Sequence, residues 1–92
     1  MASYNARAAI VGRKPSEKGQ GYTAFIALYD VNEPHKSGKA PLSVLEFPNA
    51  RNVRIVGVRE VKYMLEGNDL ILNDLGTIDV AEENGRVWLR VK

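Results

Sequence analysis

The chain has 92 residues, of which 45% are hydrophobic and 26% are charged, and its formal net charge is +2. This length predicts a single domain over residues 1–92, with a small core that dimerisation would supplement. The absence of cysteine excludes disulfides, thiolate chemistry and Cys-based zinc sites. The sequence has no apolar run of about 18 residues, and the apolar stretch near its start is too short for a signal peptide. We therefore expect a cytoplasmic protein that does not engage a membrane.

The charged residues are unevenly distributed along the chain. Residues 1–60 hold nine Lys or Arg against five Asp or Glu, whereas residues 61–92 hold four against six. A net charge of +2 is too small to indicate a polyanionic partner by itself. The basic excess nevertheless shares its part of the chain with an aromatic-rich segment, GYTAFIALY.

The first two strands are predicted over residues 4–13 and 22–31, and the loop KPSEKGQG separates them. On the first strand, small apolar residues alternate with arginines. A guanidinium group is costly to bury, so the apolar side is expected to face the core. The apolar residues are Ala6, Ala8 and Ile10, and the arginines are Arg7 and Arg13. The second strand is apolar on both of its faces.

Two further strands follow a polar connection, NEPHKSGKAP. One is predicted over residues 42–47, where Pro48 stops it, and the next begins near Asn52. In the latter strand, the side on which the apolar residues fall changes at Gly57. A change of phase at a glycine predicts a β-bulge, a feature that lets small sheets curl.

Two hairpins are predicted from their turn residues, Gly67-Asn68 and Asn84-Gly85, the second being the preferred dipeptide of a type I′ turn. A two-residue loop fixes the register of the strands that it joins. The predicted opposite pairs are Tyr63 with Leu72, Leu65 with Leu70, Ile78 with Val91, Val80 with Leu89, Asp79 with Arg90, and Glu83 with Arg86. The last hairpin then has an apolar face and a charged outer face, on which Asp79 with Arg90 and Glu83 with Arg86 are expected to form cross-strand ion pairs. Ala81 and Trp88 also lie on this outer face.

Five or six short antiparallel strands with a bulge predict a small all-β barrel, for which the OB-fold is the leading arrangement. An SH3-like barrel or a small sandwich is the alternative. One core is expected, formed by the apolar sides of the strands. Its predicted members are Ile10, Ile26, Leu28, Val61, Tyr63, Leu72, Ile78, Val80, Leu89 and Val91.

The sequence contains no recognisable catalytic or metal-binding constellation. His35 is the only histidine, and its loop of Pro, Ser, Gly and Lys predicts a solvated side chain and no nucleophile pair. The acidic residues are scattered over predicted turns and outer faces, without the clustering of a metal site. KSGKA lacks the first Gly and the Ser or Thr of a phosphate loop. We therefore expect a non-enzymatic protein with no metal, no cofactor and no small-molecule substrate.

The register of the first two strands decides what the second apolar face does. If Ile10 lies beside Ile26 in the core, the two arginines share the outer face with Phe25 and Tyr29. Residues four apart on a strand are separated by about 13 Å, so each ring can stack on its own base while basic side chains hold phosphates. In the other interpretation both rings belong to the core of a strand covered on both faces. The predicted nucleic-acid-binding residues are Arg7, Arg13, Lys14, Lys18, Tyr22, Phe25, Tyr29, Lys36 and Lys39.

The segment SEKGQGYTAF, residues 16–25, joins an early strand to an aromatic-rich second strand. It resembles the corresponding hairpin of the small single-stranded-DNA-binding proteins of filamentous phages, which also have a Ser, a basic residue, a Gly and a Tyr at similar spacing. Chain length and the all-β, Cys-poor character are similar too. The resemblance implies an OB-type barrel, a homodimer and cooperative coating of single strands. It assigns binding roles to Lys18, Tyr22 and Phe25.

Two functional hypotheses follow, and a homodimer is expected in both. The first is non-catalytic binding of single-stranded DNA or RNA by stacking and phosphate contacts, with little sequence specificity. The second is a protein–protein interaction module, such as a phage or mobile-element accessory or assembly protein, that uses the same aromatic face. Salt separates them, because neutralised phosphates release counterions and nucleic-acid affinity then falls steeply with salt.

Overall fold

The computed structural model describes residues 2–16, 21–48, 50–57 and 62–92, and most of its regular structure is β-strand. Runs of alternating or β-branched apolar residues, bounded by Gly, Pro, Asn and Asp, account for this. The strands are β1 (Ala2–Asn5), β2 (Ala8–Pro15), β3 (Tyr22–Tyr29), β4 (Ser43–Pro48), β5 (Asn52–Gly57), β6 (Lys62–Glu66), β7 (Asp69–Asn73), β8 (Thr77–Glu83) and β9 (Arg86–Val91). A short helix, α1 (Pro34–Ser37), lies between β3 and β4.

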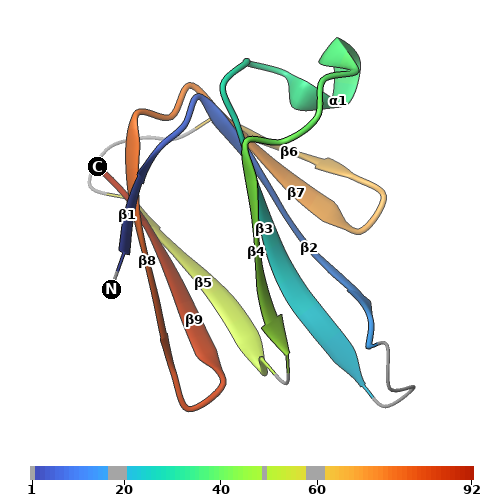
Figure 1. Cartoon of the computed structure of the whole chain (residues 1–92), viewed down its shortest axis with the longest axis vertical. Helices are drawn as coiled ribbons and strands as arrows, with labels where there is room; N and C mark the ends of the chain where they lie inside the picture. Colours follow the sequence, from blue (N-terminus) through green and yellow to red (C-terminus); the bar gives the residue numbers. More distant parts are fainter. Residues whose placement is uncertain (1, 17–20, 49, 58–61) are drawn as a thin grey trace.

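The strands form two sheets that face each other (Figure 1). The four-stranded sheet has the order β1-β8-β9-β5, and β5 runs parallel to β9. The five-stranded sheet has the order β4-β3-β2-β7-β6 and is antiparallel throughout. Among the described strands no pairing joins the sheets into a closed barrel. The all-β class is therefore confirmed, whereas the predicted OB-like barrel is not found, and two facing sheets are the arrangement of the sandwich alternative.

Two of the predicted strands are divided between the sheets. The strand predicted over residues 4–13 breaks where the Ala6 amide donates to the Gly76 carbonyl (3.0 Å) and the Arg7 amide donates to the Tyr29 carbonyl (2.8 Å). The chain thereby passes from the edge of the four-stranded sheet, as β1, to the centre of the five-stranded sheet, as β2. The strand predicted from Asn52 is likewise split into β5 and β6. Each segment contributes one strand to each sheet, so there are more strands than predicted.

The region around Gly57 was predicted to be strand with a bulge. β5 pairs residue for residue with β9 as far as Gly57, where it ends, so the predicted bulge is not found among the described residues up to Gly57; residues 58–61 lie outside the described residues. The described parts of 52–65 contain strand and no helix, as their alternating pattern predicted. No helix in the described ranges has the length and apolar character needed to cross a bilayer.

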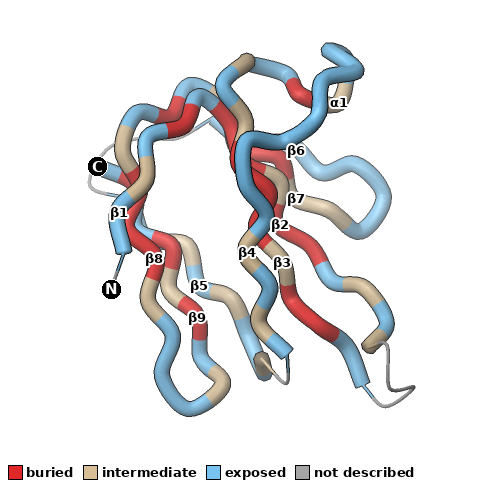
Figure 2. Tube along the Cα trace, viewed as in Figure 1, coloured by how far each residue is buried: buried red, intermediate tan, exposed pale blue. Residues whose placement is uncertain are grey.

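One hydrophobic core lies between the sheets, and Figure 2 shows buried positions on strands of both sheets. Ile10 is instead half-buried on the outer face of the five-stranded sheet, and Tyr63 is 69% exposed at its edge, so both predictions were wrong. Val61 lies outside the described residues. The prediction is confirmed for Ile26, Leu28, Leu72, Ile78, Val80, Leu89 and Val91.

The register of β2 and β3 corrects the predicted orientation of the first strand. Val11 lies opposite Ile26 and both belong to the core, whereas Ile10 lies opposite Ala27 on the outer side. The charge argument failed because Arg7 and Arg13 stand at the two ends of the core-facing side. Both are exposed there, so no charge is buried.

Both C-terminal hairpins have the predicted register. Asn84 and Gly85 have φ values of 52° and 80°, as the type I′ turn requires at its two central residues. Gly67, with φ of 62°, opens the other two-residue turn. Every opposite pair predicted for the two hairpins is present. Local turn chemistry therefore sets these registers, whereas the division into two sheets is a long-range property.

Candidate nucleic-acid interface

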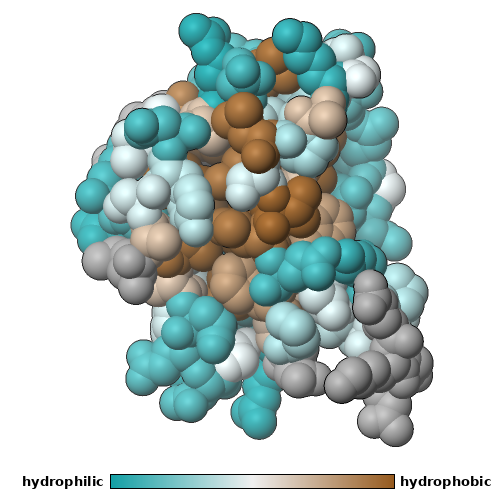
Figure 3. All heavy atoms as spheres, in the orientation of Figure 1, coloured by the Kyte–Doolittle hydropathy of each residue, from teal (hydrophilic) through white to brown (hydrophobic). Residues whose placement is uncertain are grey.

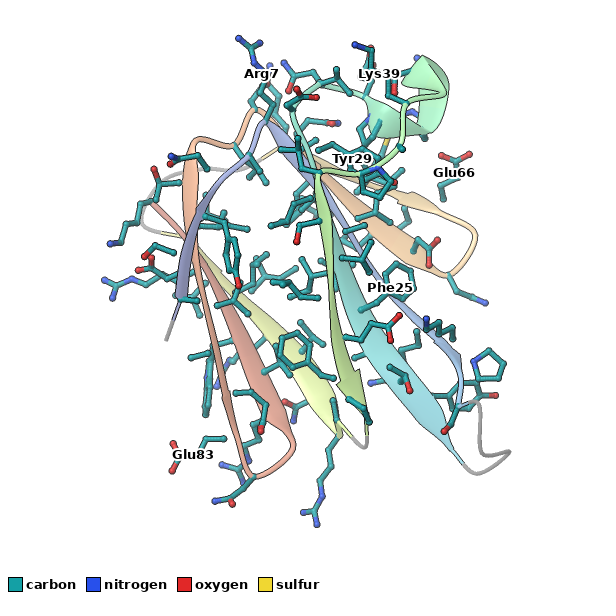
Figure 4. The ribbon with its side chains drawn as sticks, in the orientation of Figure 1. Arg7, Phe25, Tyr29, Lys39, Glu66 and Glu83 are labelled. Atoms are coloured by element: carbon teal, nitrogen blue, oxygen red, sulfur yellow. The ribbon has the colours of Figure 1, made fainter. Side chains whose placement is uncertain are left out.

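Phe25 and Tyr29 lie on the outer face of the five-stranded sheet, and each is half-buried. Phe25 lies opposite Gly12, and a Cβ placed on that glycine would be 2.8 Å from Phe25 Cζ. The ring therefore packs down onto the sheet. Figure 4 shows Phe25 partway along β3 and Tyr29 nearer to α1.

Carboxylates, and not the two arginines predicted there, adjoin Phe25. Glu46 is its neighbour in register on β4, and the Glu46 carboxylate forms an ion pair with Lys14. The Asp69 carboxylate lies against Gly12 on the other side. Lys14, a predicted phosphate ligand, is thus already paired, and the two carboxylates would repel a phosphate.

Other predicted binding residues lie toward the α1 end of the molecule. Arg7 and Lys39 lie there with Tyr29, away from Phe25 (Figure 4). Lys36 belongs to α1 and forms an exposed ion pair of 3.5 Å with Glu33. The basic rim predicted around Phe25 is therefore not assembled by these residues.

Arg13 and Tyr22 form a separate corner at the far end of β2 and β3. Arg13 lies on the core-facing side, opposite Ala24, which contradicts its predicted place beside Phe25. Its Nη2 donates to the Arg51 carbonyl at 3.2 Å. Arg13 and Tyr22 line an open cavity of about 390 Å³. We call Arg13, Tyr22 and Arg51 the Arg13 corner; Lys18, predicted nearby, lies outside the described residues.

A different aromatic and basic surface lies on the outer face of the four-stranded sheet. Parallel pairing of β5 with β9 places Arg54 beside Trp88. Arg86 and Arg90 lie two residues to either side of Trp88, and alternation puts them on the same face. Trp88 is half-buried and the three arginines are exposed. Within the described part of the chain no ion pair engages these guanidinium groups, so Arg90 and Arg86 lie opposite Asp79 and Glu83 without the ion pairs predicted for them. We call these four residues the Trp88 face.

One acidic residue beneath the Trp88 face has its charge compensated. Asp79 lies opposite Arg90, is only 4% exposed, accepts a hydrogen bond from Ser3 Oγ (2.5 Å) and pairs with Lys92 Nζ (3.0 Å). The Ser3 hydrogen bond, then that of Lys92, and more weakly the charges of Lys92 and Arg90 lower the pKa of Asp79 below its ordinary value of 3.8, against the opposing effect of burial. Asp79 is thus ionised at neutral pH with its own partners.

The sequence predicted the part of the Trp88 face that lies on the final hairpin, but not the part that lies on β5. The final hairpin was predicted to carry Ala81 and Trp88 on its charged outer face, and their register is confirmed. The contribution of Arg54 was missed, because parallel neighbours have no connecting turn and no dipeptide marks them. The usable signal was the alternation of Asn52 and Arg54 with apolar residues, which predicts a polar outer side for β5.

Candidate metal ligands do not cluster in the ranges that the structure describes. No group of three or more His, Asp or Glu within those ranges is placed to hold a metal ion. His35, which we expected in solvent, is half-buried in α1 with both ring nitrogens shielded. Comparison of the chain with protein-family models, curated proteins and solved structures finds no match. The function is therefore inferred from the shape and charge of the protein's own surfaces.

Proposed function

We propose that the protein binds single-stranded nucleic acid without catalysis, and that the Trp88 face is its principal contact surface. The observation that carries this proposal is the position of Trp88 among three exposed arginines on an open sheet face. An indole ring stacks on any base, at about 1–3 kcal/mol per base. Guanidinium groups bind phosphates through charge and forked hydrogen bonds. Contacts of this kind do not read base edges, so we expect little sequence specificity.

The Arg13 corner extends this surface. Arg51 directly precedes β5, which carries Arg54, and the Arg51 carbonyl holds the Arg13 side chain. Tyr22, which is exposed, offers a second ring at this corner. Arg13 and Tyr22 thus keep the binding role predicted from the sequence. The proposal depends on open sheet faces and does not require an OB-like barrel.

Titration with a labelled oligo-dT at two salt concentrations tests the proposal. Trp88 is the only tryptophan in the chain, so its fluorescence reports stacking at this face directly. We expect saturable quenching and an affinity that falls log-linearly with salt. Absence of binding at low salt contradicts the proposal, and so does binding that leaves Trp88 fluorescence unchanged.

A second candidate function, a protein-interaction module, is supported by the apolar edge at β4. Leu42 and Val44 are exposed there. An open groove of about 430 Å³ lies between β4 and the β1–β8 edge, with Tyr4, Leu45 and Phe47 in its lining. Figure 3 shows apolar atoms gathered in the middle of the face that contains this groove. Exposed apolar patches mark protein contacts, and binding through this one would respond little to salt.

A further inference from the structure

β6 is an edge strand of the five-stranded sheet, and all its residues are exposed. Tyr63 and Leu65, on the side that continues the core, are 69% and 72% exposed, and Met64 on the other side is 40% exposed. Edge strands are normally protected by charge, proline or a bulge, because free backbone groups invite another strand. β6 has charges only at its two ends, Lys62 and Glu66.

The β6–β7 hairpin determines which backbone groups of β6 are free. A two-residue turn makes its closing pair, Glu66 and Asp69, a hydrogen-bonded pair. Such pairs alternate in antiparallel sheets, so Met64 also bonds to β7 and Tyr63 and Leu65 do not. The amide and carbonyl groups of Tyr63 and Leu65 therefore point outward from the sheet edge.

We propose that a second copy of this chain occupies the edge, with the two β6 strands antiparallel around a two-fold axis at Met64. Lys62 then lies opposite the partner's Glu66, and Tyr63 lies opposite the partner's Leu65. The outward backbone groups meet in this register and hydrogen-bond across the axis. Both ends carry opposite charges, and the middle is apolar on both sides, the pairing that stabilises antiparallel strands.

Charge complementarity selects this occupant and this register. Parallel pairing would place Lys62 beside the partner's Lys62, and an axis at Leu65 would place Met64 opposite the partner's Glu66. Lys62 does contact Asp74 (3.2 Å), but both side chains are exposed, and such surface pairs exchange partners at little cost. Figure 4 shows Glu66 on the outer side of the hairpin, away from the sheets. An interface of one short strand is below the standard size, so we expect a dimer that depends on concentration.

A cysteine at the axis tests the register directly. The two Met64 residues would form a non-hydrogen-bonded pair, whose Cα atoms lie about 4.5 Å apart, within the disulfide range. The chain has no cysteine of its own. Under mild oxidation we expect Met64→Cys to form a covalent dimer about ten-fold faster than Val56→Cys, a matched control that is 42% exposed on β5, the edge strand of the other sheet. Equal rates for the two variants overturn the proposal.

Charge reversal tests the ion pairs in the otherwise unmodified chain by sedimentation. Lys62→Glu or Glu66→Lys alone places like charges at both ends of the interface, and each should raise the dimer dissociation constant about ten-fold. The double variant should restore it to within about two-fold, and Lys39→Glu, the same charge change elsewhere, should leave it unchanged. A chain that stays monomeric up to about 1 mM, or a double variant no better than the single ones, overturns the proposal. Neither experiment measures oligonucleotide binding, so the dimer proposal and the nucleic-acid proposal can fail independently of each other.

Discussion

The outer faces of the two sheets contain similar side chains but present different charge to solvent. On the five-stranded sheet, Phe25 lies against the backbone and its neighbour Glu46 neutralises Lys14. On the four-stranded sheet, Trp88 lies among three arginines and the nearby acid Asp79 is buried with its own partners. Glu83 is exposed opposite Arg86 but forms no ion pair with it. The comparison teaches that an aromatic residue on a sheet indicates an anion-binding surface only where its neighbours leave positive charge unpaired.

Both outer faces depend on the same core, so the largest effect is expected from a change inside it. Leu89 is fully buried on the strand that carries Trp88. Leu89→Ala should lower the free energy of unfolding by about 2–5 kcal/mol, through lost burial and a residual cavity. Val44→Ala, on the exposed β4 edge, should change it by about 0.5 kcal/mol or less. Urea unfolding followed by circular dichroism measures both, and similar losses would show that the core is misplaced.

The packing of Phe25 on Gly12 can be broken by adding one methyl group. Gly12→Ala puts a Cβ against the Phe25 ring and the Asp69 carboxylate, and we expect a loss of about 1–3 kcal/mol in unfolding free energy. In a Phe25→Ala background the loss should shrink, since one obstacle is gone. Unfolding of the four proteins of this double-mutant cycle gives the coupling. A coupling below about 0.5 kcal/mol would mean that the ring does not rest on Gly12.

The features of the two faces that could be predicted from the sequence are those set by neighbouring residues along the chain. The two-residue turns fixed the hairpin registers, so the side on which Trp88 lies was predictable. The split at Ala6 and Arg7 was not, because an interrupted strand and a continuous one have the same alternation. The pairing of β5 with β9 was also beyond local pattern, and with it the place of Arg54. The prediction that Arg13 lies on the outer face was wrong, because the core-facing side of a strand is open to solvent at the end of the strand.

Alanine at each aromatic position compares the two faces by binding. Trp88→Ala should weaken oligo-dT binding by about 1–3 kcal/mol, the value of one lost stack, with little change in salt dependence. Phe25→Ala should leave binding unchanged, because the ring is packed on Gly12 beside carboxylates. Anisotropy of a labelled oligonucleotide measures both variants. The opposite outcome would return the binding site to the five-stranded sheet, as the sequence first predicted.

Removing one positive charge at a time separates phosphate contacts from stacking. Arg54→Gln should weaken binding by less than Trp88→Ala does, and should reduce the slope of log affinity against log salt by about 0.7, one phosphate's share on a single strand. Arg7→Gln removes another exposed arginine, at the α1 end, and should change neither quantity. Titrations at several salt concentrations give the slopes. Equal effects of the two substitutions would mean that net charge, and no particular face, attracts the oligonucleotide.

The smallest effect is expected from Asp79, which tests whether the acid beneath the Trp88 face is truly neutralised. Its pKa is lower in the folded chain than its ordinary value of 3.8, so its ionised form favours folding. That contribution is complete above the ordinary pKa and is lost as pH falls through the folded one. Between about pH 5 and about pH 3, unfolding midpoints should therefore fall less for Asp79→Asn than for the unaltered chain.

The same substitution bears on the difference between the two faces. Asp79→Asn keeps an oxygen that can accept the Ser3 hydrogen bond but removes a negative charge that acts on Arg90. At neutral pH it should tighten oligonucleotide binding slightly, because the positive potential of the Trp88 face rises. Glu46→Gln removes a charge of the same sign beside Phe25 and should have no such effect. If Glu46→Gln tightened binding and Asp79→Asn did not, the acidic neighbours of Phe25 would be what keeps nucleic acid from the five-stranded sheet.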